Sequence, residues 1–243
     1  MPNLYKTKGI QKYLSKIKDE IYPTTGIKQC TRSLYCGLSG SGKTNALMQF
    51  IHASNGVFDK IFLCYKTDEP FYDFLIHELK PDGLIEVFKS VESFPNVDEF
   101  DDEATYVNRK EKPPRYLIIF DDCINDCKIG KNNQKMRNYF TYGRKKCLTI
   151  VFLSQSYFQT DKFFRDQMNY LILTSIASNK DLKTIVREYS LGGLTVDVIL
   201  SAYQFIKEND TDNNLDFLKI DLNGDCPKEK KLSRNFLDYI NYE

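Results

Sequence analysis

Short runs of apolar residues alternate with longer amphipathic stretches along most of the chain, a pattern typical of parallel β-strands separated by helices. Helices are predicted where apolar side chains recur at helical spacing, over residues 44–51, 71–79, 181–189 and 196–206. Strands are predicted for residues 30–36, 60–65, 84–88, 116–120, 148–153, 170–174 and 217–222. This order indicates an α/β fold with a mainly parallel central sheet flanked by helices.

The pattern divides the chain into an extension, a core and a C-terminal part. Residues 1–27 form the extension, and residues 28–190 form the core. Residues 191–243 are expected to add a helix, a strand and a tail packed on the core. In the extension, one apolar helical stripe is predicted that could pack on its own core or on a neighbouring subunit. Its members are Ile10, Tyr13, Leu14, Ile17 and Ile21.

Residues 37–44 read Gly-Leu-Ser-Gly-Ser-Gly-Lys-Thr, a complete G-x-x-x-x-G-K-[ST] pattern between a predicted strand and a predicted helix. Glycines let backbone N–H groups converge on phosphate oxygens at a helix N-terminus. A Gly- and Ser-rich surface turn is the alternative, but the flanking elements favour a nucleoside triphosphate site. Lys43 is expected to reach the β- and γ-phosphates, and Thr44 to offer its hydroxyl to Mg²⁺. The expected nucleotide contacts are Gly37, Ser39, Gly40, Ser41, Gly42, Lys43, Thr44 and Asn45.

The apolar run at residues 116–120 ends in two carboxylates, Asp121 and Asp122. Asp121 is predicted to hold the metal through its water shell, as an acidic residue at this strand end does in phosphate-loop enzymes. Asp122 is predicted to polarise the attacking water as general base. Adjacent carboxylates at a strand tip also serve as turn or cap formers, and the phosphate loop upstream favours the catalytic interpretation.

A third strand candidate, residues 148–153, is followed by Ser154 and Gln155. In a RecA-like sheet this strand tip lies beside the metal strand, so Gln155 could position the water or sense the γ-phosphate. A solvated glutamine is the alternative. Residues 179–182 read Asn-Lys-Asp-Leu and lack the acid at the fourth position of the guanine-reading N-K-x-D pattern. We therefore expect ATP as the nucleotide.

Composition is consistent with a soluble intracellular enzyme. Of 243 residues, 42% are hydrophobic and 28% are charged, enough for one domain with a substantial core. The seven cysteines contain no C-x-x-C pair, so neither a disulfide framework nor a zinc site is predicted. No apolar stretch approaches the roughly 20 residues of a membrane span, and the Lys-rich N-terminus does not have the pattern of a signal peptide. No membrane anchor is expected.

Four stretches together resemble one family. They are residues 37–44, 118–122, 142–146, and 153–158 followed by 164–167. Over about residues 28–190 the chain is similar to genome-packaging ATPases of the FtsK/HerA type, in the branch of nucleocytoplasmic large DNA viruses, virophages and Polinton-like elements. It departs from that family twice. Gly143-Arg144-Lys145 stands where members commonly show Gly-Arg-His, and residues 160–162 replace a proline-containing stretch, which leaves the alignment of Arg165 less secure than that of Gln155.

The resemblance implies a RecA-like (ASCE) P-loop NTPase that forms a homo-oligomeric ring, a pentamer or hexamer, and hydrolyses ATP with Mg²⁺ between subunits. It implies double-stranded DNA as substrate, a capsid or portal-vertex protein as partner, and action in the host cytoplasm or viral factory or in association with the virion. A neighbour's arginine is expected to stabilise the transition state. Arg144 is the first candidate, and Arg137 and Arg165 are the alternatives. Together with Lys43, Asp122 and Gln155, Arg144 and Arg165 complete the predicted catalytic set.

The net charge of +1 does not itself indicate a nucleic-acid partner. Basic residues cluster near the N-terminus, at residues 144–146 and at residues 228–234, while residues 98–103 are acidic. Local basic loops suffice to grip a phosphate backbone, although such clusters are more often solvated faces. Two alternatives remain open: another RecA-like DNA motor, such as a plasmid or chromosome translocase, and a nucleotide-gated assembly protein with little turnover.

Overall fold

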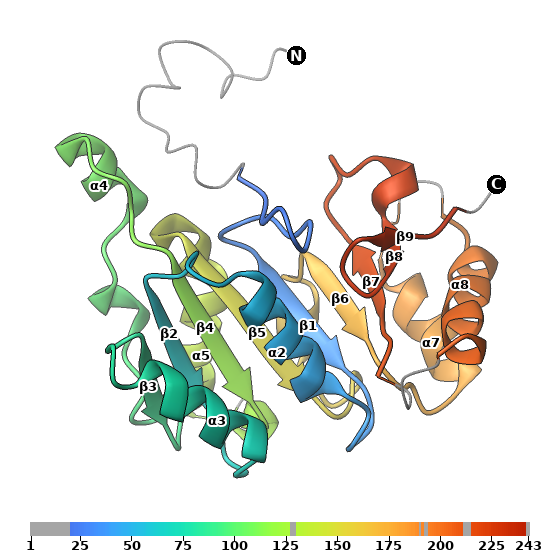
Figure 1. The fold of residues 1–243 in the computed structure, drawn as a ribbon, viewed down its shortest axis with the longest axis horizontal. Helices are drawn as coiled ribbons and strands as arrows, with labels where there is room; N and C mark the ends of the chain where they lie inside the picture. The colour runs from blue at the N-terminus through green and yellow to red at the C-terminus, as the bar shows by residue number, and fades with distance from the viewer. Residues whose placement is uncertain (1–19, 127–129, 190, 192–193, 211–214, 242–243) are drawn as a thin grey trace.

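The computed structural model describes residues 20–126, 130–189, 191, 194–210 and 215–241. Within them, one nine-stranded sheet has the order β3-β2-β4-β5-β1-β6-β7-β8-β9 (Figure 1). Six strands are mutually parallel: β1 (Arg32–Cys36), β2 (Lys60–Cys64), β3 (Ile85–Phe88), β4 (Tyr116–Asp121), β5 (Leu148–Ser154) and β6 (Tyr170–Leu173). The antiparallel strands β7 (Leu218–Asp221), β8 (Leu232–Arg234) and β9 (Asp238–Tyr239) extend the β6 side. The predicted α/β fold with a mainly parallel sheet is confirmed.

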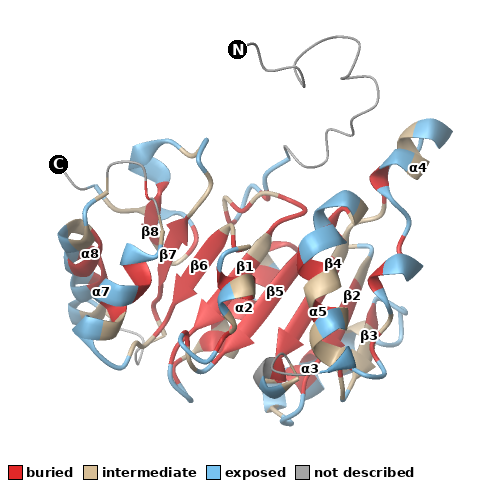
Figure 2. Cartoon of the chain, turned by 180° about the vertical axis from the view of Figure 1, so that it is seen from behind, coloured by how far each residue is buried: buried red, intermediate tan, exposed pale blue. Residues whose placement is uncertain are grey.

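The central strands are apolar on both sides because helices cover both faces of the sheet. Successive residues of β1 show this, since Leu34 packs into one apolar cluster and Tyr35 into the other. One face is covered by α2 (Lys43–Ala53) and α3 (Pro70–Leu79), which lie in front of the sheet in Figure 1. Seen from behind in Figure 2, the other face carries α5 (Lys131–Tyr142). The same face packs against α7 (Asn179–Arg187) and α8 (Val196–Glu208).

The four helices predicted from periodicity in the core and the C-terminal part are present, as α2, α3, α7 and α8. Three helices were not predicted: α4 (Glu103–Arg109), α5 and the short α6 (Lys162–Arg165). Helix α5 escaped detection because its sequence is mostly polar and only Met136, Tyr139 and Phe140 are buried. Helix α4 buries only Glu103 and projects from the body of the molecule (Figures 1 and 2). Neither helix has the broad apolar stripe that sequence periodicity detects.

The predicted N-terminal helical stripe lies outside the described residues except for Ile21. That residue forms an isolated antiparallel bridge with Lys28, so the last member of the stripe is not helical. No helix in the described part of the chain is both long and apolar enough to cross a membrane.

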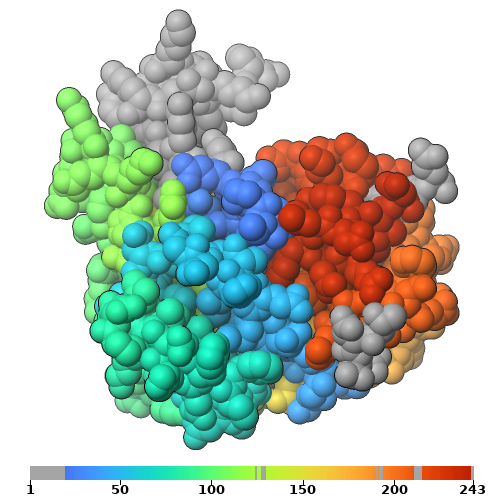
Figure 3. Space-filling view, in the orientation of Figure 1, coloured from blue at the N-terminus to red at the C-terminus, as the bar shows by residue number. Residues whose placement is uncertain are grey.

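The C-terminal strands continue the sheet of the core. Strand β7 pairs with β6 in antiparallel register, with Leu171 opposite Ile220. The space-filling view shows these C-terminal residues, in red, packed directly beside the N-terminal part of the core, in blue (Figure 3). Lys219 of β7 is 1% exposed and donates hydrogen bonds to the carbonyl oxygens of Thr25, at 3.0 Å, and Phe236. Through Lys219, strand β7 is therefore hydrogen-bonded to the segment that precedes β1.

Candidate functional site

The loop between β1 and α2 adopts a backbone that requires glycine at several positions. Gly40 and Gly42 have φ angles of 70° and 89°, in the left-handed region, and Gly42 caps α2. At Gly37 the requirement is space, because a Cβ would lie 2.0 Å from Thr174 Oγ1 and 2.9 Å from the backbone nitrogen of Ser175. The loop therefore fits tightly against the end of β6 while its other side, at Gly40, stays open. An open loop at a helix N-terminus is suited to binding phosphate.

A cavity of about 270 Å³ lies over this loop. It is located at the edge of the sheet where β1, β4 and β5 end, and Figure 1 shows the strand ends at this edge. Because parallel strands present their carboxyl ends at one edge, three motifs distant in sequence meet there. Four further residues line the cavity: Glu69 and Phe71 at the start of α3, Gln155 directly after β5, and Leu215 in the segment before β7. The remaining lining residues are Ser39, Gly40, Ser41, Gly42, Lys43, Thr44, Asn45, Asp121 and Asp122. The predicted nucleotide contacts thus line one cavity, except Gly37, which lines a neighbouring pocket that also includes Gln155.

Lys43 lies at the floor of the cavity and is 9% exposed. Its ammonium group donates to the carbonyl oxygens of Gly37, at 3.0 Å, and Leu38, at 2.9 Å. Burial lowers the pKa of Lys43, while the charge of Asp121 acts in the opposite direction. A largely desolvated cation beside the loop is a strong electrostatic partner for phosphate oxygens.

Asp121 ends β4 and is 7% exposed. Burial raises the pKa of this carboxyl group to about 6, while the hydrogen bond from Tyr72 and the charge of Lys43 lower it. The Tyr72 hydroxyl donates to Asp121 Oδ2 at 2.6 Å. The carboxyl group is therefore mostly ionised at neutral pH and held in one orientation.

Asp122 and Gln155 are in direct contact, as their strand order requires. Strand β5 lies between β1 and β4, and Asp121 pairs in register with Leu153. Gln155 Nε2 donates to Asp122 Oδ1 at 3.0 Å, and Thr67 Oγ1 lies 3.4 Å from Asp122 Oδ2. The backbone of Asp122 has a φ angle of 53°, uncommon for a non-glycine residue and a conformation that often marks functional sites. Its half-buried carboxylate faces the cavity and could accept a proton from a bound water.

The three candidate arginines lie in different environments. Arg165 is 9% exposed, donates to Glu188 Oε1 at 2.9 Å and lies 4.6 Å from the centre of the Tyr157 ring. Arg137 is bound to Asp161 at 2.8 Å and stacks on Phe163 at 4.3 Å. Neither lines the cavity.

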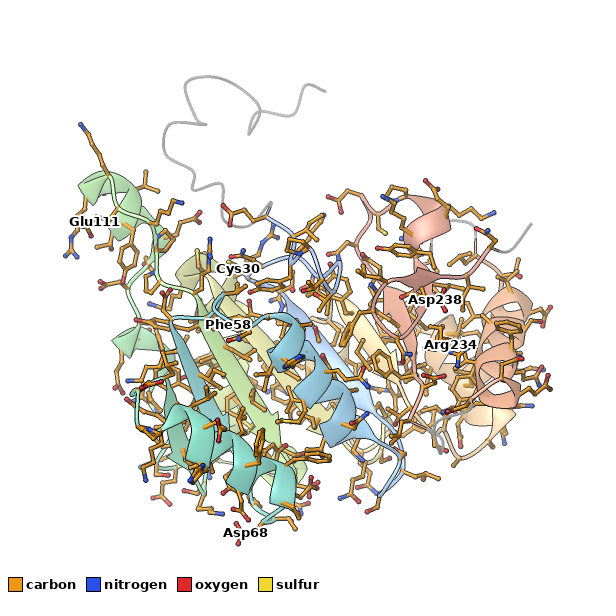
Figure 4. All side chains as sticks on the ribbon, viewed as in Figure 1. Cys30, Phe58, Asp68, Glu111, Arg234 and Asp238 are labelled. Atoms are coloured by element: carbon orange, nitrogen blue, oxygen red, sulfur yellow. The ribbon has the colours of Figure 1, made fainter. Side chains whose placement is uncertain are left out.

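Arg144 is exposed, and within the described residues its side chain has no hydrogen-bond or ion-pair partner. It lies in the turn Gly143–Lys146, which precedes β5, whereas Gln155 follows that strand. The following residue, Cys147, packs against Cys30, which Figure 4 labels at the edge opposite Asp68 and the ends of the parallel strands. A seven-residue strand spans about 20 Å, so Arg144 cannot reach the cavity of its own chain.

Sequence reasoning missed four residues at the cavity: Glu69, Phe71, Tyr72 and Leu215. Tyr72 contacts Asp121, and the other three line the cavity. Residues 71–79 were recognised only as an amphipathic helix, and no local pattern distinguishes a tyrosine that packs in the core from one that binds a carboxylate. Proximity to a strand tip 49 positions away along the chain is a tertiary property.

The donor set suits a nucleoside triphosphate with Mg²⁺. The loop and the start of α2 present backbone N–H groups, and Lys43 adds a buried positive charge. Mg²⁺ in such sites binds phosphate oxygens, waters and few protein oxygens, for which Thr44 and Asp121 are available. No further carboxylate cage is needed for this kind of metal site.

Comparison with known proteins identifies one family and several solved structures that share one fold. The family model described as Poxvirus A32 protein matches residues 26–221. No curated protein matches the sequence significantly. Among solved structures, B204, the DNA-packaging ATPase from Sulfolobus turreted icosahedral virus, has a TM-score of 0.54 at 12% identity, covering 85% of this chain and 97% of that chain. B204 from Sulfolobus turreted icosahedral virus 2, in complex with ATP-gammaS, gives 0.52 at 13% identity with the same coverage.

A third structure, the pCW3 conjugation coupling protein TcpA with ATPgS, has a TM-score of 0.54 at 11% identity, covering 88% of this chain and 61% of that chain. At these identities the likeness concerns the fold alone. It confirms the predicted RecA-like P-loop fold class.

Proposed function

Because the chain belongs to the Poxvirus A32 protein family, we propose that it is an ATPase that moves double-stranded DNA into a preformed viral capsid. The family match agrees with the resemblance drawn from the four sequence stretches. The fold is also that of the DNA-packaging ATPase B204. The observation that carries the proposal is the cavity in which Lys43, Asp121, Asp122 and Gln155 meet at one edge of the sheet.

In the proposed reaction, the loop residues would bind the phosphates, and Thr44 and Asp121 would hold Mg²⁺, which would supply neutralisation of phosphate charge. Asp122 accepts a proton from the attacking water. Gln155, held against Asp122 at 3.0 Å, orients that water. Lys43 stabilises negative charge on the phosphoryl oxygens throughout.

The cavity has one cationic side chain among its described lining residues, Lys43. A loose phosphoryl-transfer transition state is strongly stabilised by an added guanidinium group. Arg144 is exposed at the opposite edge of the sheet, so it can serve only the site of another subunit. We therefore propose a homo-oligomeric ring, pentameric or hexameric, with heterologous contacts in which each chain supplies Arg144 to its neighbour.

The cargo and partners follow from the same assignment. Double-stranded DNA would be gripped through its phosphates by basic residues in the ring. The ring would bind to the capsid or to a portal-vertex protein, in the host cytoplasm, the viral factory or the virion. Such backbone contacts predict binding to any duplex sequence and a steep loss of affinity with rising salt.

The decisive experiment measures ATP turnover by the purified protein with and without duplex DNA, alongside Lys43→Ala. We expect hydrolysis that requires Mg²⁺, increases with DNA and is absent in the variant. ATP binding without turnover under either condition would instead favour the nucleotide-gated assembly protein. Affinity for duplex DNA that stays constant between low and moderate salt would contradict a DNA motor.

A further inference from the structure

Tyr72 contacts Asp121, one of the two residues that are expected to hold the metal. It is 0% exposed and belongs to α3, which follows β2, the strand beside β4. Its hydroxyl donates to Asp121 Oδ2 at 2.6 Å. The phenol oxygen therefore lies at the end of β4.

The direction of this hydrogen bond follows from the chemistry of the groups. An ionised carboxylate only accepts hydrogen bonds, so Tyr72 donates its single hydroxyl hydrogen to Asp121. The hydrogen bond therefore fixes the position of Asp121 Oδ2 and the orientation of the carboxyl group.

This hydrogen bond sets the orientation that metal binding needs. Tyr72 occupies one oxygen of Asp121, while the other remains available to a water of the metal shell. We propose that Tyr72 is a positioning residue that orients Asp121 for Mg²⁺, an inference that rests on the proposed nucleotide site.

Packing fixes the position of the phenol before any ligand binds. Leu75, one turn further along α3, is 4% exposed and lies in the same apolar cluster as Tyr72. The ring of Tyr65 lies 4.8 Å away between centroids. By contrast, Phe71 and Phe74 on the outer side of α3 are 46% and 60% exposed. Since groups around metal ligands that lock their orientation strengthen metal binding, a rigid Tyr72 should lower the Mg²⁺ concentration that the site requires.

The test is Tyr72→Phe, which removes one oxygen atom and keeps the ring. Binding of a fluorescent ATP analogue is titrated with Mg²⁺ present and with Mg²⁺ chelated. We expect unchanged affinity in chelator and a half-saturating Mg²⁺ concentration about tenfold above that of the wild type. Tyr65→Phe is the matched control, because it makes the same change in the adjacent ring, which contacts Lys89 Nζ at 3.7 Å from its centroid instead of Asp121.

The outcomes separate the possible roles of Tyr72. A Mg²⁺ requirement like that of the wild type would overturn the positioning role, and so would equal weakening with and without Mg²⁺, which indicates a structural defect. The proposed nucleotide site itself fails only if the wild-type protein shows no Mg²⁺-dependent binding of the analogue. A raised Mg²⁺ requirement in Tyr72→Phe but not in Tyr65→Phe supports the inference.

Discussion

The two edges of the parallel sheet are built in opposite ways. At the carboxyl edge, Lys43 and Asp121 are both less than 10% exposed, and each is held by hydrogen bonds at or below 3.0 Å. At the amino edge, the turn before β5 presents Arg144 to solvent, and its side chain has no hydrogen-bond or ion-pair partner in the described parts of the chain. The side chains at the carboxyl edge are therefore held in place before a ligand binds, whereas Arg144 at the amino edge is exposed to solvent.

The difference indicates how the proposed active site is divided between subunits. The groups proposed to bind the ground-state phosphates are fixed within one chain, where folding has already supplied the entropy cost of orienting them. A group that acts only in the transition state can be supplied by a neighbour, so that assembly controls hydrolysis. A ring would satisfy this division, because the carboxyl edge of each subunit would contact the amino edge of the next subunit.

The largest effect is expected when both edges are tested together. Arg144→Ala should bind ATP normally and hydrolyse it about 10³-fold more slowly, because a guanidinium group acts on charge that develops in the transition state. Lys43→Ala should neither bind ATP normally nor hydrolyse it. Mixtures of these two nearly inactive variants should regain activity wherever an intact loop meets an intact Arg144, as measured by steady-state ATPase assays.

Lys145→Ala is the control, since it removes the adjacent exposed positive charge. If mixed oligomers form but show no recovery, Arg144 does not act on a neighbouring site. The contrast between the two edges would then be unrelated to catalysis.

The second expected effect lies within the carboxyl edge. Asp122→Asn keeps the size of the side chain and its contact with Gln155 but removes the proton acceptor. ATP and Mg²⁺ should bind as in the wild type, while single-turnover hydrolysis slows by about 10²- to 10⁴-fold. Asp126→Asn changes a nearby carboxylate that pairs with Lys66 at 2.6 Å, and should leave the rate nearly unchanged. If Asp122→Asn hydrolysed ATP at the wild-type rate, another group would have to act as the general base.

A third prediction contrasts Arg165 with Arg144. Arg165→Ala leaves the partly buried Glu188 without its cation and removes the contact with the Tyr157 ring, so it should reduce the free energy of unfolding by about 3 kcal/mol. Arg137→Ala, whose ion pair with Asp161 is about one-third exposed, should cost about 1 kcal/mol. Urea denaturation measures both. If Arg165→Ala kept wild-type stability but specifically lost hydrolysis, Arg165 would replace Arg144 as the arginine that stabilises the transition state.

A fourth prediction concerns Lys219, where the C-terminal strands contact the residues before β1. Burial lowers the pKa of this lysine to about 8, below its ordinary value of 10.5. Between pH 8 and 10.5 the unfolded chain therefore binds more protons at this position than the folded chain. The contribution of Lys219 to the free energy of unfolding should rise with pH across that window, by at most about 1.4 kcal/mol per pH unit.

The measurement is the difference in unfolding free energy between the wild type and Lys219→Met, taken at several pH values from 7 to 10. That difference should change with pH, whereas the difference for the exposed Lys183→Met should not. A constant difference for Lys219→Met would show that the lysine keeps its ordinary pKa in the folded protein.

The limits of prediction from sequence follow the range of each interaction. The six parallel strands are short apolar runs, so all six were predicted correctly. The phosphate loop lies within eight consecutive residues and could be predicted from its pattern alone, and its role stays a prediction. Helix α5 was missed because its three buried side chains lie among polar ones, and α4 because it projects from the body and packs very little. The contact between Asp122 and Gln155 was anticipated only through the order of strands in a RecA-like sheet.

The sequence by itself determined the chemistry available to this protein: a loop that can bind phosphates, two carboxylates and a glutamine at strand ends, and a family to compare with. Tertiary structure decided which groups meet. Tyr72 reaches Asp121 because α3 packs beside β4, Arg165 is engaged by Glu188, and Arg144 is left at the far edge of the sheet. The physical reason is that local patterns record backbone propensity and burial, whereas the partners of a side chain depend on which distant segments pack against it.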